Sequence, residues 1–196
     1  MKRSIFKTGY SLVEVLIAVS ILMLAIAGPM TIAQKGLQSS YFARDQLTAF
    51  MLAQEASEAF FALRNEAVLE EISGGSPDFS YSNLWDWTND ANLATCFGVN
   101  GCNLDFSDET LINNVVECDT ESACLLDYDE SEGRARFVTN KGSDFDSLFT
   151  RVIKLEEVVA DRELSVEVTV SWQPAIFGGA RKEVFLRTSV FNIYGR

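Results

Sequence analysis

The sequence opens with MKRSIFKTGYSLVEVLIAVSILMLAIAGPMTIAQ (residues 1–34), and this stretch decides how the rest of the chain is interpreted. A short basic leader ends at Gly9, and an apolar run starts at Tyr10. Residues 15–33 contain no charged side chain and only two polar ones, those of Ser20 and Thr31, and as a helix they would rise about 28 Å. This rise is close to the ~30 Å thickness of a bilayer's hydrocarbon core, so the run predicts a membrane-spanning helix.

Two features interrupt the apolar run. Glu14 is a lone carboxylate near its start, and such a group is costly in a membrane-length segment, which marks it as a functional position. Gly28 and Pro29 lie further along, and because Pro29 has no backbone N–H we expect the pair to kink or locally melt the helix. The basic leader predicts a cytoplasmic N-terminus and a body on the other side of the membrane.

The residues alone leave two ordinary interpretations of this segment. A secretory signal peptide would be cleaved at the small-residue pattern Ala25-Ile26-Ala27. Against it, Glu14 interrupts the apolar region and the helical pattern continues past that site. A plain signal anchor explains the apolar run and the flanking charge, but it gives Glu14 no role.

A third interpretation comes from a resemblance. The stretch KTGYSLVE (residues 7–14) resembles the leader-cleavage and methylation motif of type IV pilins and type II secretion pseudopilins. The resemblance implies that prepilin peptidase cuts between Gly9 and Tyr10, and that Tyr10 becomes the N-methylated first residue. Tyr10 departs from the phenylalanine that is usual at this position. Glu14 then corresponds to the family's acid at position five of the mature chain.

In a filament core of packed apolar helices, the charged amine of one subunit needs a partner. Glu14 of a neighbouring subunit, or of the same chain, would supply it. Such a buried pair adds little net stability but penalises wrong registers, so it serves as an alignment device. The alternative is a carboxylate that reaches the membrane interface from the end of the helix.

Beyond the predicted kink the pattern stays helical up to Ile72. The following run, SGGSP (residues 73–77), then ends the helix. This predicts one long helix that is apolar all round in its first half and amphipathic in its second, which is the pilin plan. Spacings of three and four residues mark one apolar face, formed by Ala49, Leu52, Ala53, Ala56, Phe60, Leu63 and Ala67.

The middle of the chain, residues 78–147, is acidic and lacks clear periodicity. Its four cysteines form two C-x5-C pairs, Cys96 with Cys102 and Cys118 with Cys124. This spacing favours two small loops, each closed by its own disulfide, although four cysteines allow three pairings. A zinc site is the competing interpretation, but the spacing is too wide for paired zinc knuckles and the predicted compartment is oxidising.

The densest group of acids is residues 127–133. Oxygen ligands at this density are typical of calcium sites, yet the run lacks the spacing of a recognised calcium loop. A solvated turn is therefore the alternative, and we expect no bound metal or cofactor.

The C-terminal fifty residues predict a sheet. Every second residue of 163–172 is apolar, as in a half-buried strand. Further strands are predicted at 148–159 and 182–193, with a fourth at 134–139. Because the connections are short, we expect an antiparallel meander with one face on the amphipathic helix. The predicted class is α+β, with a long N-terminal helix packed on a C-terminal antiparallel sheet.

Composition excludes several functions. The net charge of −12 and a sequence pI of about 4.4 disfavour nucleic-acid binding. There is no histidine among the 196 residues, which removes the commonest general base. No set of nucleophile, base and orienting group is visible, so we expect a protein that is not an enzyme.

Three regions are expected: a cleaved leader (1–9), a transmembrane and assembly helix (10–34) and an extracytoplasmic head (35–196). The final strand also resembles that of PilV-type minor pilins. The resemblance implies a minor pilin of the inner membrane that joins other pilin subunits in a pilus and supports assembly or adhesion. A type II secretion pseudopilin and a major pilin are the alternatives.

Overall fold

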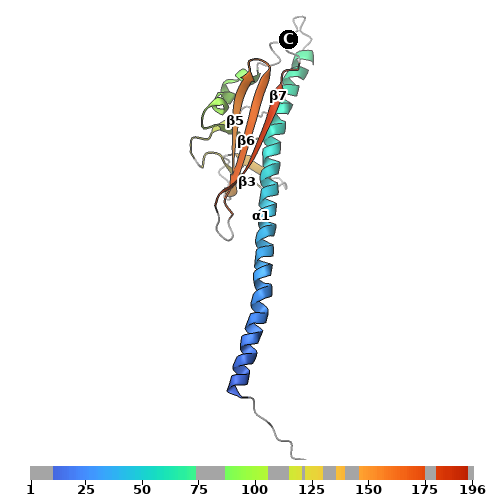
Figure 1. The fold of residues 1–196 in the computed structure, drawn as a ribbon. Coiled ribbons are helices and arrows are strands. Elements are labelled where there is room, and N and C mark those ends of the chain that lie inside the picture. Colours follow the sequence, from blue (N-terminus) through green and yellow to red (C-terminus); the bar gives the residue numbers. More distant parts are fainter. Residues whose placement is uncertain are drawn as a thin grey trace, which may run out of the picture. The chain divides into compact units, whose positions relative to one another are not determined.

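The computed structural model describes residues 11–73, 87–105, 115–120, 122–129, 136–139, 146–174 and 180–193. The chain divides into two units, Met1–Ala43 and Arg44–Arg196. A 62-residue helix begins in the first unit and ends in the second, which also holds a seven-stranded antiparallel sheet (Figure 1). The predicted α+β class is confirmed.

Helix α1 comprises Leu12–Ser73 and ends where the run of glycine, serine and proline was expected to end it. It continues through Gly28 and Pro29 without a break, so no local melting is seen there. A proline removes one backbone hydrogen bond, and the turns on either side keep theirs. A kink at this position stays a prediction.

All neighbouring strands of the sheet run antiparallel. The strands are β1 (Cys102–Leu104), β2 (Val115–Glu117), β3 (Leu125–Asp129), β4 (Arg136–Thr139), β5 (Asp146–Val159), β6 (Glu163–Trp172) and β7 (Lys182–Phe191).

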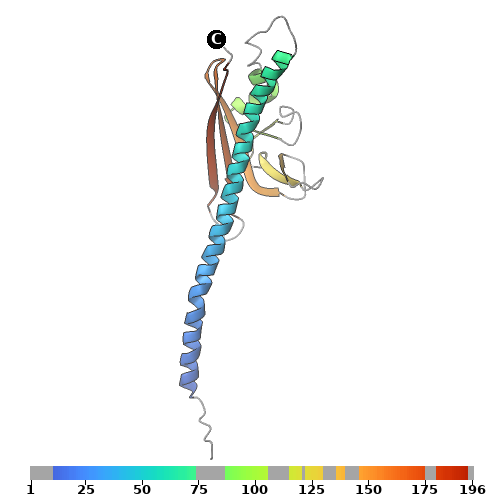
Figure 2. The same cartoon turned by 90° about the vertical axis from the view of Figure 1, so that its right-hand side faces the viewer.

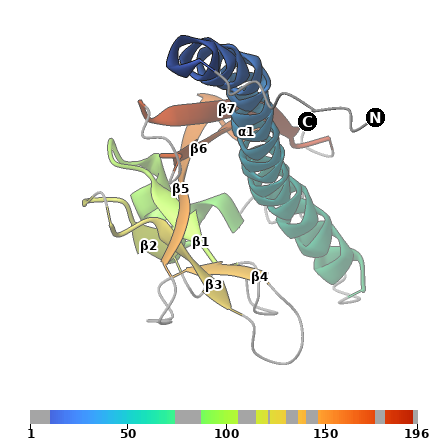
Figure 3. The same ribbon diagram turned by 90° about the horizontal axis from the view of Figure 1, so that it is seen from below.

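The sheet is organised around β5, which lies between β6 and the shorter strands (Figure 3). One edge of β5 pairs with β6, and the other pairs with β1 at Ile153 and with β3 at Thr150. The predicted meander is confirmed for β5, β6 and β7. The predicted fourth strand is present as β4, but it lies outside the meander, because both edges of β5 are taken and β4 pairs with β3 instead.

The second part of α1, from Arg44 onward, packs on the face of β5, β6 and β7 (Figure 2). Alternate residues of β6 (Val166, Val168 and Val170) are completely buried in one core with helix residues. Each fully buried valine or leucine stabilises the fold by about 1.5–3 kcal/mol. The predicted apolar face of the helix supplies the other side of this core, with Ala49, Leu52, Ala53, Ala56, Phe60 and Leu63 buried and Ala67 partly buried.

Residues 78–147 are more regular than predicted. Their described parts hold a 3₁₀ helix, η2 (Ala91–Phe97), and the strands β1 to β4. These strands are three to five residues long, which is too short for a periodic pattern to stand out in the sequence. They nevertheless reach the core, since Leu93, Leu104 and Leu126 are completely buried.

Candidate assembly surface

Residues 12–33 of the first unit present an almost continuous apolar surface. Leu12, Leu24 and Ile32 are each about three-quarters exposed, at 75%, 77% and 74%. An apolar surface of this extent needs a bilayer or other apolar helices around it. Within the described residues, α1 is the one helix long and apolar enough to cross a membrane.

Glu14 is the only charged residue among described residues 11–34 and lies in the first turn of α1. The helix begins just before it, because the backbone N–H of Glu14 donates to the carbonyl of Ser11 at 3.0 Å. An acid in the first turn is favoured by the helix dipole. The carboxylate is exposed on an otherwise apolar strip of helix formed by Val15, Ala18, Val19 and Leu22. Gly9 and Tyr10, the predicted processing site, lie outside the described residues.

An exposed apolar strip also occurs on α1 within the second unit. Leu47 and Met51 are 58% and 60% exposed, and Phe50 beside them is 42% exposed. Leu47 and Met51 are four residues apart, so they share one side of the helix. The next turn exposes Gln54 and Glu58 instead, so this strip ends there.

The second part of α1 is tied to the sheet by a buried cation that the sequence reading missed. Arg151 of β5 is 1% exposed, and its Nη1 donates to Oε2 of Glu55 on α1 at 3.0 Å. Burial lowers the pKa of Arg151 to about 10, while Glu55 and Asp105 oppose this effect. The guanidinium therefore stays protonated at neutral pH. The sequence did hold a sign of this buried cation, because Arg151 lies at an inward-facing position of a strand whose apolar residues alternate.

The remaining donors of Arg151 form hydrogen bonds with acceptors on β1. Its Nε donates to Oδ1 of Asn103 at 2.8 Å, and its Nη2 donates to the carbonyl of Leu104 at 2.7 Å. Asn103 in turn donates to Oγ1 of Thr139 on β4 at 3.2 Å. One buried polar network thus joins α1, β1, β4 and β5, and fully satisfied networks of this kind favour a single arrangement of the core.

Two disulfides close the loops next to β5. Cys96 bonds to Cys102 and Cys118 bonds to Cys124, which is the connectivity that the two C-x5-C spacings favoured. All four cysteines are therefore paired, and none is left as a free thiol to bind zinc. Both loops are anchored to their surroundings, since Cys118 N–H donates to the carbonyl of Gly101 and Arg151 N–H donates to that of Cys124, each at 3.0 Å.

Gly101 occupies a position that only glycine suits. Its φ is +74°, a value that L side chains rarely adopt. A Cβ atom there would lie 2.7 Å from the carbonyl oxygen of Ile153. The close approach of this backbone to β5 allows Cys102 to pair with Ile153 in the ladder.

The predicted acidic calcium site falls partly outside the described residues, which include Asp127 and Asp129 but not 130–133. Asp127 is buried, at 7% exposed. Asp129 Oδ2 lies 3.5 Å from Nη2 of Arg136 on the neighbouring strand. Over the described ranges, no three acidic, cysteine or histidine side chains are placed to hold a metal ion together.

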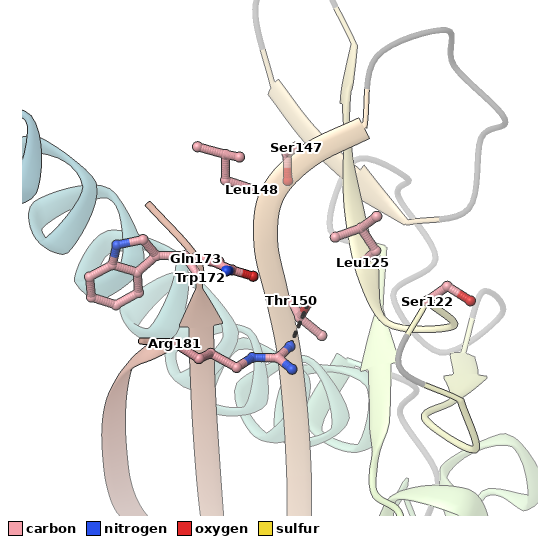
Figure 4. A pocket seen from close by; sticks show the side chains of 8 residues that line it. All are labelled: Ser122, Leu125, Ser147, Leu148, Thr150, Trp172, Gln173 and Arg181. Atoms are coloured by element: carbon pink, nitrogen blue, oxygen red, sulfur yellow. Dashed lines mark hydrogen bonds between the residues drawn. The ribbon is translucent and has the colours of Figure 1, made fainter. Parts of the chain in front are cut away.

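An open groove lies where β5 begins and β6 ends, beside Arg181 (Figure 4). Arg181 donates to Oγ of Ser171 at 3.0 Å and to Oγ1 of Thr150 at 3.3 Å, so its guanidinium is held against the sheet. Trp172 is 2% exposed, which leaves its ring no open face for stacking a ligand. The groove is lined by Ser122, Leu125, Ser147, Leu148, Thr150, Trp172, Gln173 and Arg181.

Comparison of the chain with known protein families, curated proteins and solved structures found no match. The architecture itself is pilin-like: a long N-terminal apolar helix packed on a C-terminal antiparallel sheet, with two disulfides.

Proposed function

We propose that this chain is a minor type IV pilin, a structural subunit that is processed by prepilin peptidase and incorporated into a pilus. The observation that carries the proposal is the division of α1 into two parts. The first exposes apolar side chains all round with Glu14 near its start, and the second buries one face against a sheet. A helix of this kind needs apolar partners for its first part and carries a folded head on its second.

Glu14 has a specific chemical role in this proposal. Cleavage after Gly9 creates a charged amine at Tyr10, four residues before the carboxylate. When subunits are withdrawn from the bilayer into a bundle of helices, each amine needs a carboxylate, and a misplaced subunit leaves both charges unpaired. The cost of an unpaired buried charge then selects the correct stagger between neighbouring helices.

The head is suited to a place outside the cytoplasm. Its two disulfides persist in oxidising compartments, and the basic leader favours an N-terminus that remains in the cytoplasm. We propose that it stands beyond the inner membrane before assembly and supports pilus assembly or adhesion afterwards. The proposed role requires binding of other pilin subunits and no catalytic chemistry.

A type II secretion pseudopilin or a major pilin would use the same helix and head. Sheared filaments separate these roles, because a minor subunit is present there at a small fraction of the major one. Absence from pili together with dependence of protein secretion on this chain would instead favour the pseudopilin.

The role of Glu14 is tested by Glu14→Ala in cells that assemble the filament. We expect normal membrane insertion but a large loss of the subunit from sheared pili. Ser20→Ala is the matched control, since Ser20 is another polar residue of the span and its hydroxyl already donates to the carbonyl of Leu16 at 2.8 Å. Equal incorporation of the two variants would show that the acid has no part in assembly.

A further inference from the structure

Strand β7 forms an edge of the sheet. It pairs with β6 from Glu163↔Phe191 to Trp172↔Lys182, and no other described strand pairs with it. The pairing contains no register shift, and the strand contains no proline. An edge strand of this length presents a row of backbone donors and acceptors that can take up another strand.

The two faces of β7 differ in character. Val184 and Leu186 lie opposite Val170 and Val168, so they face the core, yet both stay only partly buried. Helix α1 therefore leaves this margin of the sheet partly open. The other face carries Glu183, Phe185 and Arg187 in alternate positions, and Phe185 is 58% exposed.

The charges on this outer face alternate across the strands. Lys154 of β5 lies opposite Glu167 of β6, and Glu167 lies opposite Arg187 of β7. Arg187 Nη1 is 3.3 Å from Oε1 of Glu167. The row thus reads positive, negative, positive, and a negative side chain would continue it beyond the edge.

We propose that β7 pairs antiparallel with β7 of a second copy of this chain, about a two-fold axis at Phe185. In this register Arg187 lies opposite Glu183 of the second copy, and Glu183 lies opposite its Arg187. The row of alternating charges then continues across the edge, and the two Phe185 rings become direct cross-strand neighbours. On the core side, Val184 meets Leu186, and both partly exposed side chains lose contact with water.

Other registers lack this match. Centring the pair on Arg187 or on Glu183 places like charges opposite each other, and centring it on Val184 opposes Arg187 to Arg181. A register displaced by one residue would turn the core side of one copy toward the outer face of the other. The self-complementary sequence therefore selects both the partner and the alignment.

This contact is distinct from the filament role and does not depend on it. A two-fold contact uses the same surface on both copies and closes after two, whereas a filament needs a contact that propagates. The paired strands would link two subunits, or two filaments, through their heads.

The register is tested by cysteine substitution in the full chain, purified in detergent micelles and mildly oxidised. Directly opposite residues have Cα atoms about 4.5–5.5 Å apart, within the range a disulfide spans. Phe185→Cys should give a covalent dimer on a non-reducing gel. Ser189→Cys, on the same face of the same strand, should stay monomeric because it faces residue 181 of the second copy. Equal cross-linking of the two variants, or none with Phe185→Cys, would overturn the proposal.

The role of the charges is tested in two ways. Disulfide cross-linking is measured in the Phe185→Cys variant, and dimerisation is measured by sedimentation of the chain that keeps Phe185. Glu183→Arg places two like-charged pairs across the edge, and we expect dimerisation to weaken about tenfold. Adding Arg187→Glu to Glu183→Arg restores opposite charges and should recover most of the loss. An unchanged dimer with Glu183→Arg would show that helix contacts in the micelle, and not β7, hold the copies together.

Discussion

Arg151 on β5 donates a hydrogen bond to Glu55 on α1 across 3.0 Å, although the two residues are 96 positions apart in the chain. The guanidinium is almost completely buried, at 1% exposed, whereas the carboxylate is 46% exposed. A buried cation is tolerated only where its donors are satisfied, and here they reach the helix and β1 together. The pair therefore holds the helix, β1 and β5 in one arrangement.

Removing the acid should destabilise the head. Glu55→Ala leaves Arg151 buried without its carboxylate, and we expect a loss of about 1–3 kcal/mol in the free energy of unfolding, toward the lower end because water reaches Glu55. Glu58→Ala, on the exposed side of the same helix, should change stability little. Denaturant unfolding followed by tryptophan fluorescence measures the stability of both variants. Equal losses would show that the ion pair does not stabilise the head.

The two disulfides offer a comparison between loops of equal size. Each joins cysteines six positions apart, so the entropy of the unfolded chain falls equally, by an amount worth about 2 kcal/mol. Replacing both Cys96 and Cys102 by alanine also opens space in the core, where both are completely buried. Replacing Cys118 and Cys124 removes one partly exposed side chain.

The first double variant should therefore show the larger drop in melting temperature. The intact protein under the same conditions is the reference. A larger drop for the Cys118 and Cys124 variant would contradict the burial of the Cys96–Cys102 bond.

Gly101→Ala should be poorly tolerated. The added Cβ meets the carbonyl of Ile153 at 2.7 Å, and φ of +74° is unfavourable for alanine, so we expect a loss of about 1–3 kcal/mol. Gly36→Ala is the control, because no atom lies within 4 Å of its Cβ position and alanine favours a helix. Thermal unfolding of the head should be unchanged in the control. A Gly101 variant as stable as the parent would mean that this loop does not lie against β5.

Strong periodic signals made much of this fold predictable. The spacings in α1 from Ala49 to Leu63 identified its buried face, and the alternation in β6 identified a half-buried strand. Both signals extend over ten or more residues, so the pattern stands above chance. The cysteine spacing likewise favoured the observed pairing.

Other features depend on contacts between distant residues and could not be predicted. Along the chain β4 lies between β3 and β5, yet in the sheet β3 pairs with β5. The order of the strands in the sequence does not predict this pairing. The pairing of Glu55 with Arg151 depends on the angle at which the helix crosses the sheet. Glu14 is different again, because its proposed partner is an amine that exists only after cleavage.

The intact mass of the protein, purified from membranes of cells that contain prepilin peptidase, tests the proposed role most directly. We predict a mature chain that lacks residues 1–9, begins at Tyr10 and carries one added methyl group. The variant Gly9→Ala should be processed more slowly and keep more of the leader, because the peptidase cuts after glycine in the motif that this stretch resembles. A mature chain that begins at Gly28, or one that retains residues 1–9 in the parent protein, would contradict the pilin proposal.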